Sequence, residues 1–262
     1  MTPSEEFIQM CAEGRLADAK RAINNDPNIV SANTEYNTKY AFYKACQNGH
    51  LRVAQWLLRA KPDIDVRANN ETAFQRACVN GHLRVVLWLL RAKLDIDVSV
   101  DNEIAFRWAC SNGHLRVAQW LLRVKPDIDV GAANEYAFRY ACCRGHLRVA
   151  KWLLQIKPDL DVGANDEYAF QRACVSGHLQ VAQWLLRVKP DIDVSANNES
   201  AFQRACVSDH LRVAQWLLRV KPDIDVGADN EFALRWACVN GHLRTAQWLL
   251  RAKPGICVGV AV

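Results

Sequence analysis

The sequence predicts an all-α solenoid of about eight stacked helix–turn–helix units. All seven histidines of the 262-residue chain follow one another at steps of 32 residues, at His50, His82, His114, His146, His178, His210 and His242. One cysteine and one tryptophan repeat with the same step, and each unit contains two segments with helical spacing of apolar residues. A fixed period of roughly 20 to 50 residues indicates stacked supersecondary units.

The repeats form one array over residues 1–262, with atypical ends. We expect residues 1–33 to be an N-terminal capping repeat, 34–253 to be seven near-identical repeats, and 254–262 to be a short C-terminal tail. The first repeat keeps Cys11 and Gly14 in register but carries Lys20 and Arg21 in its second helix, which suits the polar outer face of a cap. The other end, GICVGVAV, follows without a polar closing repeat. We therefore expect the C-terminal end to fray or to self-associate.

The first helix of each unit is predicted from segments such as ETAFQRAC. Phe74, Ala77 and Cys78 follow the i, i+3, i+4 spacing of one helical face. Asn70 is predicted to cap this helix, with Glu71 in the first turn, where the helix dipole favours an acid. The equivalent predicted caps are Asn102, Asn134, Asp166, Asn198 and Asn230.

The second helix is predicted to begin after a glycine, as in Gly81, and to end near residues 91–93. Leu83, Val86, Leu89 and Leu90 give it one apolar face. Most units then have a proline and the sequence DIDV, which indicates an extended connection with turns. The tryptophan of each unit shares this helix, and we expect it to fill the space between neighbouring second helices.

Composition favours a soluble chain in a reducing compartment. The formal net charge is +5. The N-terminus, MTPSEEFIQM, is acidic and has no apolar signal region. No apolar run in the sequence is long enough to cross a bilayer. Seven of the ten cysteines recur once per repeat. Packed helices lie about 8 to 10 Å apart, which is too far for equivalent cysteines to form disulfides. These thiols are expected to be small buried residues.

The repeated Cys-x3-His pattern offers candidate chemistry, as a metal site or as a nucleophile with its base. A catalytic dyad is not normally needed seven times, so packing is the favoured interpretation. Cys143 departs from its column and adjoins Arg144, but no base or oxyanion donor accompanies it. The sequence therefore predicts no catalytic residue, no metal site and no cofactor.

The combination TAFQRAC, NGHL, WLL and KPDIDV resembles the ankyrin repeat over nearly the whole chain. The chain lacks the family's Pro and first His in the first segment, and Lys replaces the exit Gly. The segments NEYAF, KPDIDV and AQWLL are similar to sequences in the ankyrin families of giant DNA viruses that infect amoebae. The resemblance implies a protein-binding concave groove with loop tips. The resemblance also implies that some viral relatives are adaptors, which join a host target to ubiquitin-ligase machinery through a terminal motif. We find no such motif in this sequence.

Candidate partner-binding residues are those that vary between otherwise near-identical units. Tyr, Trp and Arg are frequent interface anchors, and the first helix is the groove-lining helix in the resembled family. One column of that helix contains Lys44, Arg76, Trp108, Tyr140, Arg172, Arg204 and Trp236, its neighbour contains Arg107, Arg139 and Arg235, and a third column beside the loop contains Tyr136, Tyr168 and Phe232. Random substitution of solvent-exposed residues after duplication of the repeats would produce the same variation between units.

Three functions stay open. The favoured one is a protein-interaction module or adaptor in the cytoplasm, which would be the host cytoplasm for a viral protein. Basic and aromatic columns could instead bind nucleic acid, although the acidic loops oppose it. A recently expanded array with no tight partner is the third.

Asp209 provides a test of the predicted turn between the two helices. It replaces the glycine found there in the other units, so we expect it to adopt a left-handed conformation. On this basis Asp209→Gly should raise stability by about 0.5 to 1 kcal/mol.

Overall fold

The computed structural model describes residues 2–30, 35–65, 68–92, 96, 98 and 100–253. Sixteen α-helices and one 3-10 helix occur in these residues, and none of them is in a β-strand, so the predicted all-α ankyrin-type fold class is confirmed. The predicted tail, 254–262, lies outside the described residues. The chain divides into two compact units, residues 1–133 and 134–262.

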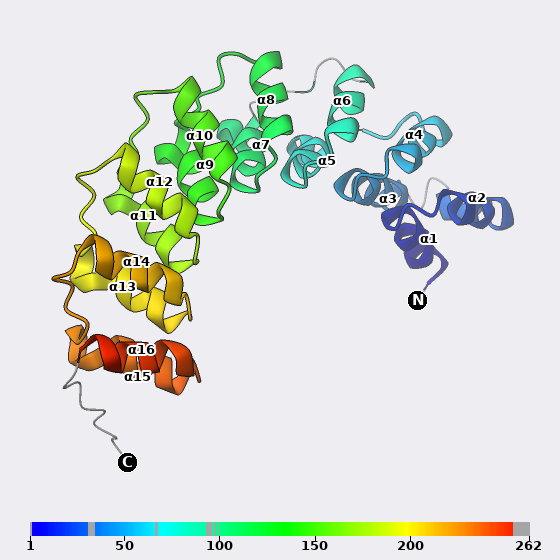
Figure 1. The fold of residues 1–262 in the computed structure, drawn as a ribbon. Coiled ribbons are helices and arrows are strands. Elements are labelled where there is room, and N and C mark those ends of the chain that lie inside the picture. Colours follow the sequence, from blue (N-terminus) through cyan, green and yellow to red (C-terminus); the bar gives the residue numbers. More distant parts are fainter. Residues whose placement is uncertain are drawn as a thin grey trace. The chain divides into compact units, whose positions relative to one another are not determined.

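Helix pairs follow one another through both units (Figure 1). The first unit contains α1 (Pro3–Ala12), α2 (Leu16–Asn25), the 3-10 helix η1 (Pro27–Val30), α3 (Glu35–Gln47), α4 (Leu51–Ala60), α5 (Ala68–Val79), α6 (Leu83–Ala92), α7 (Val100–Ser111) and α8 (Leu115–Val124). The second contains α9 (Ala132–Cys143, starting two residues before the boundary), α10 (Leu147–Ile156), α11 (Ala164–Val175), α12 (Leu179–Val188), α13 (Ala196–Val207), α14 (Leu211–Val220), α15 (Ala228–Val239) and α16 (Leu243–Ala252).

Each core is made by first helices that stack on one another and by the second helices that cover them. In the second unit α11 packs on α13 and α13 on α15. Phe170, Ala173 and Cys174 of α11 and Leu185 of α12 are almost completely buried. The same positions are buried in the repeats from α3 to α16, except that Cys238 of the last repeat is exposed, and this is the pattern that the apolar spacing predicts.

The tryptophan column packs differently from the prediction. Trp216 of α14 lies with its ring centroid 6.3 Å from that of Phe170, in the first helix of the preceding repeat. Trp184 lies 6.1 Å from Phe138 in the same way. The tryptophan thus reaches the first-helix layer of the preceding repeat, where a phenylalanine ring offers a tilted aromatic contact.

The predicted caps of the first helices are wrong where the structure describes them. Asp166 does not cap α11; it lies between Asn165 and Glu167 in a left-handed turn, with φ near 60° at all three residues. The start is instead organised by Asp161, whose Oδ1 accepts a hydrogen bond from the Gly163 N–H at 2.9 Å. The predicted register is late because the second Asp of the D-x-D sequence makes this side-chain turn.

The same turn recurs at the other described first helices of the second unit. Asp193 and Asp225 accept equivalent bonds from residues 195 and 227. Asn134 and Asn230 lie in left-handed turns like that of Asp166. The predicted caps Asn70, Asn102 and Asn198 have side chains that lie outside the described residues.

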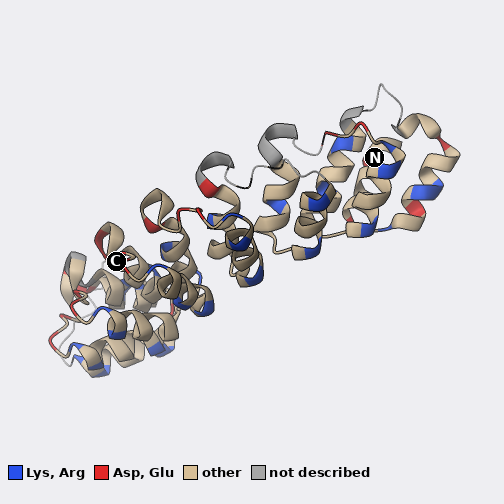
Figure 2. Ribbon diagram, turned by 90° about the horizontal axis from the view of Figure 1, so that it is seen from above, with Lys and Arg blue, Asp and Glu red and all other residues tan. Residues whose placement is uncertain are grey.

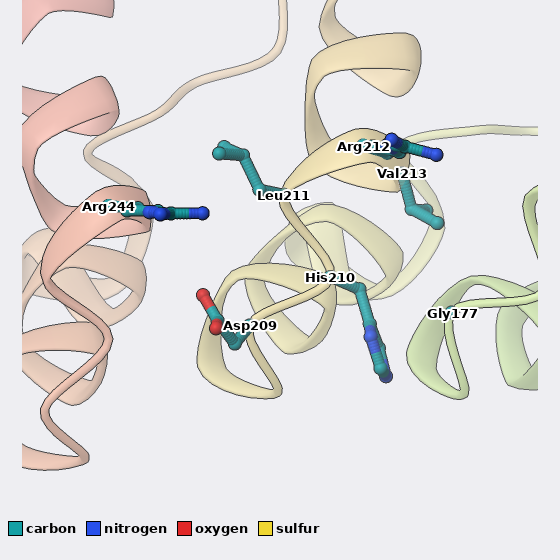
Figure 3. A pocket seen from close by; sticks show the side chains of 7 residues that line it. All are labelled: Gly177, Asp209, His210, Leu211, Arg212, Val213 and Arg244. Atoms are coloured by element: carbon teal, nitrogen blue, oxygen red, sulfur yellow. The ribbon is translucent and has the colours of Figure 1, made fainter.

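The turn between the two helices of a repeat matches the prediction. Gly177 has φ of +78° and Asp209, at the equivalent place, has φ of +59°. A Cβ on Gly177 would lie 2.6 Å from Nδ1 of His210 in the next repeat, and Figure 3 shows His210 pointing towards that glycine. Glycine is therefore favoured at position 177 both by conformation and by the close approach of the histidine.

The last helix pair exposes apolar side chains. The exposed fraction is 73% for Val239, 68% for Leu243, 44% for Trp236 and 42% for Leu250. Cys238, whose equivalents in the preceding repeats are buried, is also exposed. The positions equivalent to Val239, Leu243 and Leu250 are half-buried in the preceding repeats of the second unit.

Candidate functional site

Charge is divided between the helices and the loops of the repeats. No Asp or Glu occurs in residues 136–158 or 168–190, which cover most of two consecutive helix pairs. Figure 2 shows acidic residues along the loops and at first-helix starts, and basic residues on the helices. These two segments therefore carry only positive formal charge, and the acids of α9 and α11 lie at the starts of those helices.

The lysines that end the second helices pair with the loop acids. Lys189 Nζ lies 3.1 Å from Glu167 Oε1, and Lys253 Nζ lies 2.7 Å from Asp225 Oδ1. The bond from Lys253 lowers the pKa of Asp225. Lys157 lies 3.9 Å from Glu135 in the same arrangement. The loop charges are thus partly balanced within each repeat.

Tyrosine side chains from α9 and α11 form a cluster on the first-helix face. The rings of Tyr136 and Tyr140 stack with centroids 4.2 Å apart. Tyr168, from the next repeat, lies 5.8 Å from Tyr140. Burial raises the pKa of Tyr168, and its side-chain hydrogen bond with Tyr140 raises it further. All three rings are half-buried, so part of each remains accessible.

Three arginines lie over these rings. The guanidinium carbon of Arg139 is 5.2 Å from the ring centroid of Tyr168, that of Arg172 is 5.8 Å from the same ring, and that of Arg144 is 5.7 Å from the ring of Tyr140. Guanidinium groups at such distances are attracted to the ring faces. We call Tyr136, Tyr140, Tyr168, Arg139, Arg144 and Arg172 the Tyr-Arg cluster.

A family model for ankyrin repeats matches residues 7–102, 106–198 and 170–260. The chain belongs to the ankyrin-repeat family. Ankyrin repeats are generally protein–protein interaction modules. No curated protein matches this chain significantly.

Arg139 also has a role inside its own ankyrin repeat. It is 8% exposed, and its Nε donates to the carbonyl oxygen of Asn134 at 2.6 Å. Gln171 makes the corresponding bond to Asp166 at 2.9 Å. Arg235 reaches the carbonyl of Asp229 at 3.3 Å. The Gln/Arg column thus supplies a donor to the left-handed turn, which gives Arg139 and Arg235 a structural reason to be present.

The remaining candidate residues have surroundings of their own. Lys44 lies 5.3 Å from the ring centroid of Tyr40, in the second ankyrin repeat. Phe232 and Trp236 contact each other in the last repeat, with centroids 6.0 Å apart. Arg204 Nε donates to Ser200 Oγ at 3.2 Å. Arg76 is exposed, and Arg107 and Trp108 are half-buried.

Arg144 is the member of the cluster that the sequence analysis did not select. Its equivalents Asn80 and Asn112 donate a side-chain bond to a carbonyl of the preceding ankyrin repeat, at 2.8 Å in each case. Asn48 and Asn240 make the same bond. In this repeat an arginine replaces the asparagine that makes this bond elsewhere. This substitution could have identified Arg144 as a candidate residue from the sequence.

The repeated thiols and histidines have structural surroundings. Burial raises the pKa of Cys142, Cys174 and Cys206 well above the usual value. His178 bonds to the backbone of Cys143, and burial lowers the pKa of His178. Within the described ranges no three His, Cys, Asp or Glu side chains gather as metal ligands would. No helix of those ranges has both the length and the hydropathy needed to span a bilayer.

A hollow of about 370 Å³ lies at the inter-helix turns of the last three repeats of the second unit. It is lined by Gly177, Asp209, His210, Leu211, Arg212, Val213 and Arg244 (Figure 3). The hollow is open to solvent and carries one acid between two arginines. It therefore lacks the enclosed geometry of a small-molecule site.

Proposed function

We propose that this chain is a non-enzymatic protein-interaction module whose first-helix face binds a partner protein. The observation that carries the proposal is the Tyr-Arg cluster, in which half-buried tyrosine rings from two repeats hold arginine side chains at one surface. Tyr and Arg are the residues that most often dominate binding energy at protein interfaces. Such pre-positioned side chains lose less conformational entropy on binding than free ones do.

The proposal is tested by a pull-down from cell extract with the full chain, with and without nuclease. Tyr140→Ala/Tyr168→Ala should lose partners that the parent chain retains after nuclease treatment. The matched control, Gln155→Ala/Gln183→Ala, changes two side chains on the second helices α10 and α12 and should retain them. Thermal unfolding of each variant separates lost binding from lost folding. Equal recovery by the parent and the tyrosine variant contradicts the proposal.

Two alternatives are distinguished by the same experiment. Recovery of nucleic acid, lost on nuclease treatment, would favour binding through the basic and aromatic columns. Recovery of no specific partner would favour a recently expanded array without a tight partner. The adaptor role, in host cytoplasm for a viral protein, stays a prediction from the resemblance to giant-virus ankyrin families. A cytoplasmic setting is supported by the free thiols throughout the described chain.

We also propose that the C-terminal end of the array self-associates. The support is the exposure of Trp236, Val239, Leu243 and Leu250 on one helix pair. Contiguous exposed apolar side chains of this kind commonly mark interaction surfaces.

A further inference from the structure

We propose that the outer face of the second helices in the first unit binds the phosphate backbone of double-stranded nucleic acid. The inference goes beyond the proposed function, because it concerns the second helices and a different class of partner. It rests on six side chains that we call the arginine face: Arg52 and Arg59 of α4, Arg84 and Arg91 of α6, and Arg116 and Arg123 of α8.

The arginine face consists of two rows that cross three successive second helices. Within each helix the two arginines are about two turns apart, so they lie on the same side, roughly 10 Å from one another. All six are exposed, whereas the opposite side of α4 is buried through Ala54 and Leu57. α4 covers α3, which packs on α5, and α6 packs on α8. Packed helices lie about 8 to 10 Å apart, so the spacing is similar in both directions.

The row at the helix starts is not explained by folding. Arg52, Arg84 and Arg116 each occupy the second position of their helix, where the helix dipole disfavours a cation. No acid lies in the first turn of α4, α6 or α8 to offset this charge. Within the described residues, none of the six arginines makes a hydrogen bond or an ion pair. Their charge is therefore available to a partner from outside.

Acids are absent around the helix starts. Residues 36–62, 72–94 and 104–126 contain no Asp or Glu, and each range covers most of one helix pair. The nearest acids along the chain from Arg52 and Arg116 are Asp63 and Asp127, in the loops beyond the far ends of α4 and α8. A helix of this length spans about 15 Å, whereas the Debye length is about 8 Å at physiological ionic strength. The acidic loops that oppose nucleic acid are thus largely screened from this row.

The surface suits a duplex better than a single strand or a membrane. Single strands bind by stacking their bases on open aromatic rings. Trp56 and Trp88 are instead half-buried, with ring centroids 6.4 Å from Phe7 and 6.2 Å from Phe42. Binding in a membrane interface buries apolar side chains in the lipid. In α4, α6 and α8, whose side chains are all described, Val124 is the one large apolar side chain that is exposed.

Arginine matches the chemistry of a phosphate backbone. A guanidinium group donates two parallel N–H bonds to phosphate oxygens. Duplex DNA carries one phosphate charge per about 1.7 Å of its axis, so a length that spans three helices, about 18 Å, carries roughly ten. The duplex therefore has enough phosphates for all six arginines. Contacts of this kind hold the backbone and do not read the bases, so binding is independent of sequence.

The test is fluorescence anisotropy of a labelled DNA duplex of mixed sequence with the full-length chain, over a series of salt concentrations. The variant is Arg52→Gln/Arg84→Gln/Arg116→Gln. The control, Lys44→Gln/Arg76→Gln/Arg204→Gln, removes the same charge from first helices. A third variant, Arg52→Lys/Arg84→Lys/Arg116→Lys, keeps the charge. Single-stranded DNA, polyglutamate and vesicles that contain phosphatidylserine are measured in parallel, and thermal unfolding shows which variants stay folded.

We expect the parent chain to bind the duplex with a Kd of about 1 to 100 μM at physiological salt, the usual range for sequence-independent binding. In the glutamine variant the affinity at low salt should fall about tenfold or more. The slope of log K against log salt concentration should become less steep by roughly 0.9 for each arginine removed. The control should keep the parent slope. The lysine variant should keep most of the binding, since lysine also binds phosphate.

Four results would overturn the inference. The first is no binding of the duplex at any salt concentration. The second is an equal loss in the glutamine variant and the control, which would show that only net charge matters. The third is a loss in the control alone, which would assign nucleic acid to the first-helix columns. The fourth is that single strands, polyglutamate or vesicles bind as tightly as the duplex with the same dependence on the three arginines. None of these results bears on the proposed protein-binding surface, which is tested through Tyr140 and Tyr168.

Discussion

Thr245 donates a hydrogen bond from its hydroxyl to Oδ1 of Asp209, at 2.7 Å, across 36 positions of sequence. Both residues are exceptions in their columns: Asp209 replaces a glycine of the inter-helix turn, and Thr245 replaces a valine at the start of the second helix. Thr245 is completely buried. The two exceptional residues therefore form one pair in neighbouring repeats.

This pair changes what is expected of Asp209→Gly. Glycine relieves the left-handed conformation, which is worth about 0.5 to 1 kcal/mol, but it leaves the buried Thr245 hydroxyl without its partner, at a cost of about 1 to 3 kcal/mol. We expect the single change to give no gain. Asp209→Gly/Thr245→Val should instead be more stable than the parent by about 1 kcal/mol. Urea unfolding of the two single variants and the double variant measures the coupling, and additive effects would contradict it.

A second prediction concerns the contact between turn glycines and histidines. Gly177 and Gly241 have similar φ, +78° and +74°. A Cβ on Gly177 would lie 2.6 Å from Nδ1 of His210, whereas a Cβ on Gly241 would meet no other residue within 4 Å. Gly241→Ala should cost about 1 to 2 kcal/mol for conformation alone. Gly177→Ala should cost more, since His210 must also move. Equal losses in chemical denaturation would show that the histidine contact contributes nothing.

The sequence contained much of this fold because the repeat itself marks the packing. Phe170 and Cys174 are buried where the helical spacing predicts, and Asp209 has the left-handed φ expected from its glycine equivalents. Contacts between residues that depart from their repeat columns were not predictable, because nothing in a single sequence pairs Asp209 with Thr245. The start of the first helix was misplaced because Asp161 and Asp166 are both plausible caps, and only the backbone shows which one bonds.

The candidate surface was predictable in part for the same reason. Variable columns selected Tyr140, Tyr168 and Arg172, which the structure brings together. Arg139 was selected as well, although its bond to the Asn134 carbonyl shows a structural role that a column of Gln and Arg does not reveal. Arg144 was missed, since its significance depends on the ring of Tyr140 beneath it.

A third prediction concerns pH. Burial lowers the pKa of His82, His114 and His178 below the unfolded value of 6.5. As the pH falls, the unfolded chain therefore binds more protons than the folded chain does. The stability they contribute is fully present above about pH 6.5 and declines as the pH falls through that value. The urea midpoint should therefore be lower at about pH 5.5 than at about pH 7.5.

The control for this effect is His178→Gln. It should show a smaller pH dependence than the parent, because one titrating group is removed. Carboxylates such as Asp225 titrate at lower pH, since the bond from Lys253 lowers the pKa of that group. A midpoint that is unchanged or higher on the acid side of this range would contradict the account of the histidines.

A fourth prediction follows from the exposed apolar end. Val239→Lys/Leu243→Lys should abolish any concentration-dependent increase in sedimentation coefficient, because both side chains are mostly exposed and a charge there opposes apolar association. The control Gln155→Lys/Gln183→Lys adds the same charge on α10 and α12 and should sediment like the parent. A parent chain that stays monomeric at every concentration would rule out self-association.

The central claim is that the first-helix face at Tyr140 and Tyr168 is the surface that contacts the partner. The most direct test is site-specific photo-crosslinking in cell extract, with benzoylphenylalanine at position 168 of α11 or, for comparison, at position 155 of α10, followed by identification of the crosslinked species. We predict discrete protein crosslinks from position 168 and none of the same species from position 155. Crosslinks to the same proteins from position 155 alone would contradict the claim and assign binding to the second helices.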